Sequence, residues 1–304
     1  MRNTVAAGQN GGNAVRFHRH HLIKKAKVNR SHGGNFIVFL FVFLLGLFTA
    51  LPFIYAISNS FKPLNELWIF PPPLFPRNPV LTNYADLFEL MQNSWVPISR
   101  YLFNTVLITV LGSLGQIVLA SMCAYALAKI PFPGAKFLFK LIFFSLMFGA
   151  SVTSVPSYLI MIRLGLVDTV WAVIIPAMGS TFGLYLMKQF MEQIYDSILE
   201  AARIDGAGEW TIFWKIVMTQ VRPAWLTLMV FSVQTLWNTQ PGTLIYSEQL
   251  KTFPYAISQI VAGGIARAGV ASAMSVVMAL VPIVVFMFTQ NSIIETMTSS
   301  GVKE

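Results

Sequence analysis

The chain has 304 residues, of which 55% are hydrophobic and only 11% are charged. Because that charged fraction is about half that of a typical soluble domain, the sequence excludes a water-soluble particle and predicts a lipid-covered one. The 21 Lys+Arg against 12 Asp+Glu give a formal charge of +9, which suits either nucleic acid or an anionic membrane surface. The one cysteine, Cys123, lies in an apolar run, so no disulfide framework is expected, and we interpret it as a small buried residue.

Six stretches without charged residues are long enough to cross about 30 Å of hydrocarbon, which takes about 20 helical residues. The predicted spans are 33–61, 101–128, 141–162, 169–187, 223–247 and 268–294. The first could be a secretory signal, but about 35 residues precede it and its apolar part is longer than a signal's core, so we expect it to stay. A shorter run, 252–266, contains Pro254, Gly263 and Gly264 and is predicted to be an external or re-entrant segment.

Basic residues are distributed unevenly on the two sides of these six spans. One side collects 15 of the Lys and Arg residues and the other side 6. Because basic residues stay in the cytoplasm, both termini are predicted to be cytoplasmic, as a basic arm (1–35) and a tail (295–304) flanking a transmembrane domain (36–294). This placement favours the membrane over nucleic acid. The arm also holds four histidines, interpreted as part of a basic tail at lipid headgroups because no Cys or carboxylate accompanies them: His18, His20, His21 and His32.

Two segments between spans are long. The external one, 62–100, has five prolines between residues 71 and 79 and carries Trp68 and Trp95, which predicts a rigid extended ledge with interfacial aromatic anchors. The other is the cytoplasmic segment 188–222.

The segment 188–222 is predicted to form a helix-turn-helix at the membrane face. Asp196 can cap a first short helix that runs to about Asp205, and Gly206 can take the left-handed conformation that ends it. A second helix then runs toward Pro223. One side of the first helix is predicted to be apolar, lined by Ile198, Leu199, Ala202 and Ile204. Taken alone, such a segment could equally be an amphipathic loop that fills space between two spans.

The spacing within this segment is distinctive, because it reads Glu200-Ala201-Ala202-x3-Gly206-x9-Ile216. In this it resembles the signature loop of permease subunits in ATP-binding-cassette (ABC) importers, in particular the sugar-importing, maltose-type (MalG-like) branch. The resemblance covers about residue 71 to the C-terminus. Further matching stretches are 124–128, Phe132-Pro133-Gly134, Leu164-Gly165-Leu166, Gln189-Phe190, Trp237-Asn238 and Ser300-Gly301-Val302-Lys303. The chain departs from the family at Thr219 and near Asp196, at Tyr195, where prolines are usual, which leaves the bend near Thr219 open.

The resemblance implies an all-α polytopic membrane protein with the six transmembrane helices of the type I importer permease fold. It implies that the first short helix is a coupling helix seated in a cleft of a separate ATPase, so we refer to 188–222 as the coupling loop. Glu200 would face a basic or polar group there, Ala201 and Ala202 would allow close contact, and Gly206 would make the turn; Asp205 and Ile216 complete the docking set. Without the spacing, an exposed Glu would be interpreted as merely solvated.

The expected partners follow from the same resemblance. They are a second, MalF-like permease subunit forming a heterodimer, two copies of an ABC ATPase, and an extracytoplasmic solute-binding protein, all assembled at the cell (inner) membrane. The chain contains no Gly-x4-Gly-Lys-[Ser/Thr] phosphate loop, so ATP and Mg²⁺ are expected on the ATPase. We expect no cofactor and no catalysis on this chain.

A secondary transporter and a membrane-embedded enzyme are the alternatives from other classes. Both need ionisable groups at membrane depth, and the six predicted spans contain no Asp, Glu, Lys, Arg or His. This argues against proton coupling but leaves open a sodium site built from carbonyl groups.

Polar and aromatic side chains in the spans suit a neutral, polyhydroxylated solute that hydrogen-bonds and stacks on rings. Many of these residues could instead join helix to helix. The family resemblance points to a sugar or oligosaccharide, and another neutral polar solute is the alternative. The candidate pathway residues are Tyr125, Tyr158, Gln234, Trp237 and Asn238, with Asn104, Thr105, Gln116, Ser151 and Ser154 as further polar positions.

Overall fold

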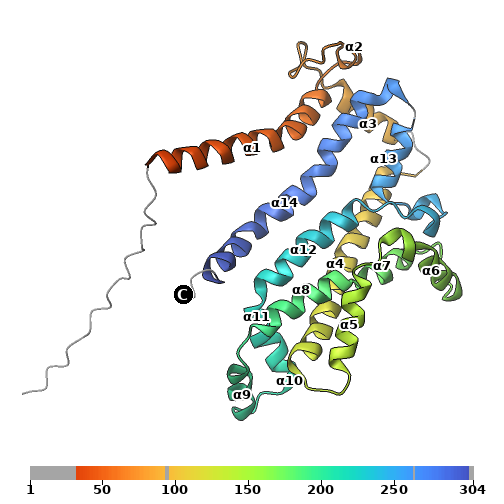
Figure 1. The fold of residues 1–304 in the computed structure, drawn as a ribbon. Helices are drawn as coiled ribbons and strands as arrows, with labels where there is room; N and C mark the ends of the chain where they lie inside the picture. Colours follow the sequence, from red (N-terminus) through yellow and green to blue (C-terminus); the bar gives the residue numbers. More distant parts are fainter. Residues whose placement is uncertain (1–31, 93–95, 263, 301–304) are drawn as a thin grey trace, which may run out of the picture. The chain divides into compact units, whose positions relative to one another are not determined.

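The computed structural model describes residues 32–92, 96–262 and 264–300, and within these ranges its regular elements are all helices, without a strand (Figure 1). The chain divides into two units, Met1–Leu51 and Pro52–Glu304. The predicted arm up to residue 31, including three of its histidines, lies outside the described residues, as do Trp95 and 301–304. His32 is the first residue of α1 (His32–Ser60), so the helix begins where the polar arm gives way to an apolar run.

Three described helices are long and apolar enough to cross a membrane: Gly33–Ser60 in α1, α4 (Ile98–Lys129), and Ala268–Gln290 in α14 (Ala268–Ser300). A fourth is reached if the segment Glu209–Gln220 and α12 (Arg222–Trp237), which meet at 78°, count as one span. The first three helices and α12 correspond to four of the six predicted spans, whereas Glu209–Gln220 lies in the predicted coupling loop. α14 continues beyond the predicted limit at residue 294 and includes the first part of the predicted tail.

The predicted third and fourth spans are each two short helices rather than one. Residues 141–162 fall in α5 (Ala135–Ser145) and α6 (Ala150–Arg163), which are separated where Gly149 takes an extended conformation. Residues 169–187 fall in α7 (Trp171–Met178) and α8 (Thr181–Glu192). The second break has a local cause, because the Ser180 hydroxyl accepts a hydrogen bond from the Gly183 N–H at 3.0 Å and so begins a new helix.

The predicted fifth span also ends early. α12 stops at Trp237, and the chain continues through two 3₁₀ turns, η2 (Gly242–Leu244) and η3 (Glu248–Leu250). The physical reason is that Pro241 cannot donate a helical hydrogen bond and Gly242 takes a φ of +54°. The helix therefore ends although the sequence remains apolar. The short run predicted beyond it is α13 (Phe253–Val261), followed by η4 (Ile265–Arg267).

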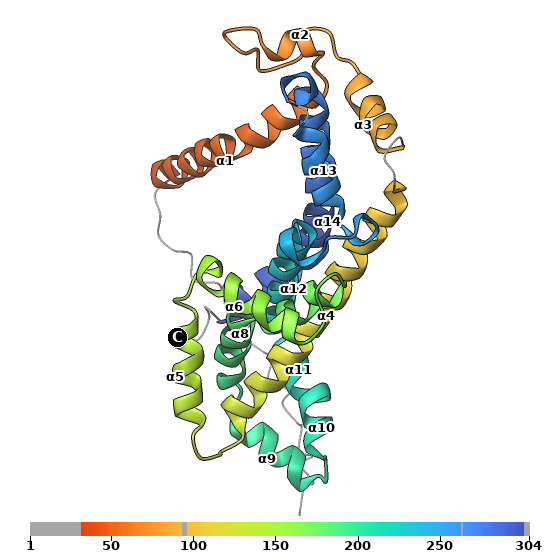
Figure 2. The same cartoon turned by 90° about the vertical axis from the view of Figure 1, so that its right-hand side faces the viewer.

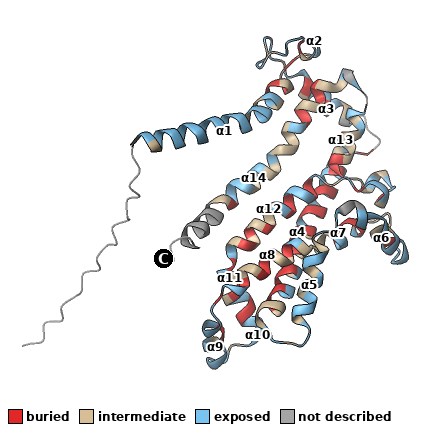
Figure 3. Ribbon diagram, viewed as in Figure 1, coloured by how far each residue is buried: buried red, intermediate tan, exposed pale blue. Residues whose placement is uncertain are grey.

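α4 lies at the centre of the packed core of the second unit. It packs against α7, α8 and α12, and Figure 3 shows buried residues in red along these helices. Small residues allow the close approach: a Cβ atom on Gly112 would lie 2.6 Å from Leu236 Cδ1 of α12. A second cluster joins α3 (Thr82–Gln92), α4, α13 and α14.

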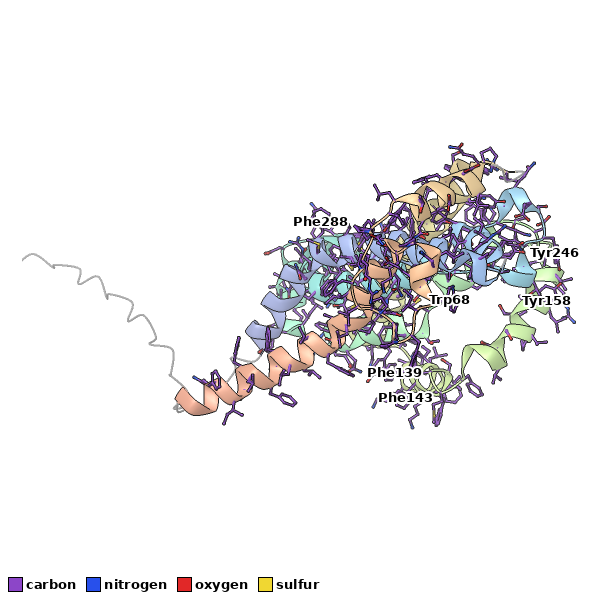
Figure 4. The ribbon with its side chains drawn as sticks, turned by 90° about the horizontal axis from the view of Figure 1, so that it is seen from above. Trp68, Phe139, Phe143, Tyr158, Tyr246 and Phe288 are labelled. Atoms are coloured by element: carbon purple, nitrogen blue, oxygen red, sulfur yellow. The ribbon has the colours of Figure 1, made fainter. Side chains whose placement is uncertain are left out.

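The predicted ledge is tied down by buried charges. The Glu66 carboxylate, in α2 (Leu64–Leu67), accepts hydrogen bonds from the backbone N–H groups of Arg77 and Asn78, each at 3.0 Å. The Lys62 ammonium donates to Asn59 Oδ1 at 2.7 Å and to the Pro73 carbonyl at 2.5 Å. The expectation of an extended ledge was therefore only partly right, because α2 and α3 flank the proline-rich stretch. Trp68 is exposed on it, as an anchor residue would be (Figure 4).

Candidate functional site

The first helix of the coupling loop is α9 (Asp196–Ile204), and its end is a tightly hydrogen-bonded turn. Gly206 has a φ of +82°, its N–H donates to the Arg203 carbonyl at 3.0 Å, and the Ala207 N–H donates to the Ala202 carbonyl at 3.0 Å. This pair of bonds is the Schellman arrangement, which needs a left-handed residue at the position of Gly206. The predicted end of the first helix and the predicted left-handed conformation of Gly206 are confirmed.

Two details of the predicted loop were wrong. Asp196 does not cap α9: Tyr195 occupies the cap position, and Asp196 is the first helical residue, paired with Lys129 at 2.7 Å. Ile198 and Ile204 do not lie on the buried side, because they are 39% and 86% exposed whereas Leu199 is 1% exposed. The physical reason is the helical period, which places Ile204 well away from Leu199 around the axis.

We call the exposed face of α9 the row of exposed positions spaced i, i+3, i+4 and i+7: Ser197, Glu200, Ala201 and Ile204. Asp196, Ile198 and Arg203 beside this row are exposed as well. Leu199 points the other way, into a cluster shared with α4, α8 and α12, and Ala202 is half-buried against it. Asp205 and Gly206 extend the exposed surface. One carboxylate, one small residue and one large apolar residue are thus presented outward by a helix whose opposite face is fixed.

The second half of the loop contains a π-helix. α10 (Glu209–Thr211) leads into η1 (Ile212–Val217), which has π geometry, then α11 (Met218–Gln220), and the chain bends by 78° into α12. Three residues of η1 are buried, and Ile216 packs partly against the same cluster as Leu199. The predicted second helix is therefore confirmed in position, and Thr219 lies within it, in α11. Short π segments often occur at functional sites.

Side chains of α4 hold both ends of α9. The Lys129 ammonium bonds the Ile194 carbonyl at 2.6 Å in addition to Asp196, where α9 begins. Beyond the end of α9, the Tyr125 hydroxyl donates to Glu209 Oε2 at 2.6 Å, and Arg203 Nε donates to Glu209 Oε1 at 2.7 Å. The guanidinium hydrogen bond, followed by that of the tyrosine, holds the pKa of Glu209 below its ordinary value.

We call the contacts of Tyr125 and Lys129 with Glu209 and Asp196 the clamp. Sequence reasoning missed the clamp, because it placed Tyr125 in the substrate pathway. Tyr125 is buried, its ring lies 5.5 Å from that of Phe213, and its hydroxyl is bonded within the loop. No local spacing connects Tyr125 with Glu209, because the two residues are 84 positions apart.

A cavity of about 700 Å³ lies between α12, α13 and α14. Gln234 on α12 and Asn238, which directly follows this helix, line it together with Gln240, Ser275 and mainly apolar side chains. None of its lining residues is charged. Two of the predicted pathway residues therefore share one neutral, amide-bearing cavity.

The remaining two predicted pathway residues lie elsewhere. Trp237 is buried and donates from Nε1 to the Met278 carbonyl at 3.1 Å, which joins α12 to α14. Tyr158, on α6, shares a hydrogen bond of 2.5 Å with the hydroxyl of Tyr246 (Figure 4). The structure does not bring these side chains into the cavity of Gln234 and Asn238.

Two solved structures of ABC transporters share this fold. The chain matches a crystal structure of a bacterial ABC transporter for import of the acidic polysaccharide alginate, with a TM-score of 0.70 and 24% identity over 86% of this chain and 98% of that one. A second structure, of the bacterial alginate transporter with its alginate pentasaccharide-bound periplasmic protein, matches with a TM-score of 0.54. These likenesses define the fold class.

Sequence relatives define the family. The polygalacturonan/rhamnogalacturonan transport system permease protein YtcP of Bacillus subtilis is 30% identical over 223 residues, which is 73% of this chain and 76% of that protein. The arabinooligosaccharides transport system permease protein AraQ of Halalkalibacterium halodurans is 30% identical over 280 residues, 89% of this chain and 94% of that one. No family model matches the chain. The chain belongs to the permease subunits of carbohydrate ABC transporters.

Proposed function

We propose that this chain forms half of the translocation pathway of an ATP-driven importer for a neutral sugar or oligosaccharide and docks an ATPase through α9. The observation that carries the proposal is the exposed face of α9, where Glu200, Ala201 and Ile204 project from a helix fixed at both ends. A space-filling loop would have no need of two anchors. The ATP and Mg²⁺ would bind to the ATPase, which makes this chain a non-catalytic subunit.

Docking is supported by the chemistry of this face. Ala201 lets another backbone approach closely, Ile204 offers apolar area that water otherwise covers, and Glu200 can pair with a basic group of the partner. Asp205 and Gly206 lie at the exposed edge of this face, and Ile216 packs against the buried cluster that contains Leu199. The remaining partners would be a related permease subunit as heterodimer and an extracytoplasmic solute-binding protein.

The same proposal includes six crossings with both termini in the cytoplasm. The pairs α5 with α6 and α7 with α8 would each make one crossing as broken helices, which membranes tolerate where the break is covered by protein. The uneven distribution of 15 against 6 basic residues sets the orientation. In a chain with Cys123 replaced, impermeant thiol reagents should label a cysteine at Pro72 or Lys251 in intact cells but not one at Asp205. Labelling at Asp205 would reverse the orientation and remove the docking site.

The neutral cavity supports the choice of substrate class. The amides of Gln234, Asn238 and Gln240 can donate to and accept from sugar hydroxyls, and the lining has no cation to balance a carboxylate. Relatives with uronate polymers in their names show that the family also handles acidic sugars, so charge is the property to test.

The test compares uptake of neutral and uronate oligosaccharides by cells that lack only this chain and by cells in which it is restored. Restoration should recover uptake of a neutral saccharide, and Gln234→Met should reduce it because that change removes the amide while keeping the length of the side chain. Gln92→Met, at an exposed position of α3 outside both the cavity and the coupling loop, is the matched control and should have no effect. Recovery of uronate uptake alone would refute the substrate class. Recovery of another polar solute alone would support the alternative that the solute is not a sugar.

A further inference from the structure

α4 contacts loops at both of its ends through side chains rather than through packing alone. At the end described above, Tyr125 and Lys129, one turn apart, hold the two ends of α9. At the opposite end, α4 holds residues 248–253, which we call the outer loop. Figure 2 shows α9 and α10 at the end of α4 remote from α3.

The contacts with the outer loop are made by buried polar residues. Asn104 Nδ2 donates to the carbonyls of Gln249 at 2.8 Å and Lys251 at 3.0 Å, and the Thr105 hydroxyl accepts the Phe253 N–H at 2.8 Å. Asn104 is 1% exposed and Thr105 is fully buried, so these bonds are shielded from competing water. The Tyr101 hydroxyl adds a bond of 2.9 Å to Glu248. Arg100 Nε, on the exposed side, also donates to the Gln249 carbonyl at 3.2 Å, so the outer loop has five side-chain bonds to α4.

Between these ends α4 is one unbroken helix. Its 32 residues span about 48 Å at the helical rise of 1.5 Å per residue. It contains no proline, and near its middle Gln116 accepts the Ser232 hydroxyl of α12 at 2.5 Å. The path from the coupling loop through α12 is different, because it passes a π-helix and a 78° bend. A displacement at one end of α4 must therefore move the other end, whereas the bent path can absorb it.

We propose that α4 transmits movement of the coupling loop to the outer loop, and that Tyr125, Lys129 and Glu209 are the positioning residues that connect α9 to it. This inference rests on the proposed docking of an ATPase by α9. The physical requirement is that α9 keeps its orientation relative to α4 when it is pulled. One contact would act as a hinge, but contacts at both ends of α9 fix its direction.

The test uses two variants that disconnect the clamp with little change of shape. Tyr125→Phe removes one hydroxyl and leaves the ring on Phe213, and Glu209→Gln removes the charge that pairs with Arg203. Glu192→Gln is the matched control, because Glu192 pairs with Lys188 at 2.6 Å and is 44% exposed, against 2.7 Å and 51% for Glu209 with its partner.

Three quantities are measured in the assembled transporter: the ATPase that purifies with the chain, ATP hydrolysed, and sugar transported. A fourth is the change on adding ATP in the labelling rate of Gln249→Cys with Cys123 replaced, since only the backbone of this exposed residue bonds to Asn104. Wild-type co-purification tests the proposed docking, and the variants then test the clamp.

In the two clamp variants we expect unchanged co-purification but roughly two- to tenfold less sugar per ATP, the factor that corresponds to one net hydrogen bond. The labelling response at position 249 should fall in proportion, and the double variant should be little worse than either single one because both break the same connection. Glu192→Gln should match the wild type. Full coupling in both clamp variants would overturn the inference, as would equal losses in the control or loss of the ATPase from the clamp variants alone.

Discussion

Gly206→Val perturbs the end of α9 through the backbone alone. A Cβ atom at this glycine would meet no heavy atom within 4 Å, so no clash contributes. The destabilisation comes from the φ of +82°, because a left-handed conformation costs a β-branched residue on the order of 1–2 kcal/mol or more. If the valine escapes to negative φ, the bonds from Gly206 to Arg203 and from Ala207 to Ala202 are lost, at about 0.5–1.5 kcal/mol each. By either route the turn loses roughly 1–3 kcal/mol, and the direction of α9 is no longer fixed.

The experiment has a matched control two residues away. Gly208 also has open space around a Cβ, but its φ of −70° and ψ of 156° suit valine, so Gly208→Val should behave as the wild type. Gly206→Asn should be intermediate, because asparagine tolerates positive φ. All three variants should reach the membrane in normal amounts, since the change lies outside the spans. Gly206→Val alone should lose the ATPase on purification and lose sugar uptake, with Glu200→Ala affected less. A Gly206→Val chain that retains its ATPase and transports normally would refute the docking role of α9.

Three further predictions concern other contacts. Gly269→Ala should lower the free energy of unfolding by about 1–3 kcal/mol, measured by thermal denaturation. The new Cβ would lie 2.7 Å from Asn83 Cγ and would displace the buried Asn83 amide from the two carbonyls to which it donates. Gly46→Ala, where the Cβ would meet open space, should leave the stability unchanged. Asp168→Ala should speed hydrogen exchange of the backbone N–H groups at 246 and 247, which the carboxylate accepts at 2.9 and 2.8 Å, and Asp168→Asn should do so less. Because the pKa of Glu209 is lowered in the folded protein, the stability that ionised Glu209 gives to the coupling loop is fully present above the ordinary glutamate pKa. That stability is lost only as the pH falls through the lower pKa of the folded state. Sugar transported per ATP should therefore stay constant between about pH 8 and pH 5.

The turn at Gly206 could be predicted because its signal is local. A glycine after a short amphipathic stretch defines a helix end whatever the surroundings are, and the structure has the helix end at that point. The same holds for α1, α4 and α14, whose apolar length alone indicates a helix in lipid.

The broken helices and the clamp could not be predicted in the same way. Hydropathy indicates whether a segment lies in lipid or in water, but not whether its helix is continuous. The helix breaks near Gly149 and Ser180 therefore leave no mark on the apolar pattern. The early end of α12 did have a signal, in Pro241 and Gly242, which the apolar run obscured. The bond between Tyr125 and Glu209 depends on tertiary packing of two distant segments, for which a single sequence carries no periodic signal.

The central claim is that this chain moves sugar with energy supplied by a separate ATPase. Its most direct test is transport by liposomes that contain this chain, its partner permease and the ATPase, with the binding protein and a labelled neutral saccharide outside. ATP inside should drive accumulation that persists when ionophores collapse the proton and sodium gradients, since the six predicted spans contain no Asp, Glu, Lys, Arg or His that could bind a coupling proton. Accumulation that needs an ion gradient and proceeds without ATP would contradict the account and favour a secondary transporter.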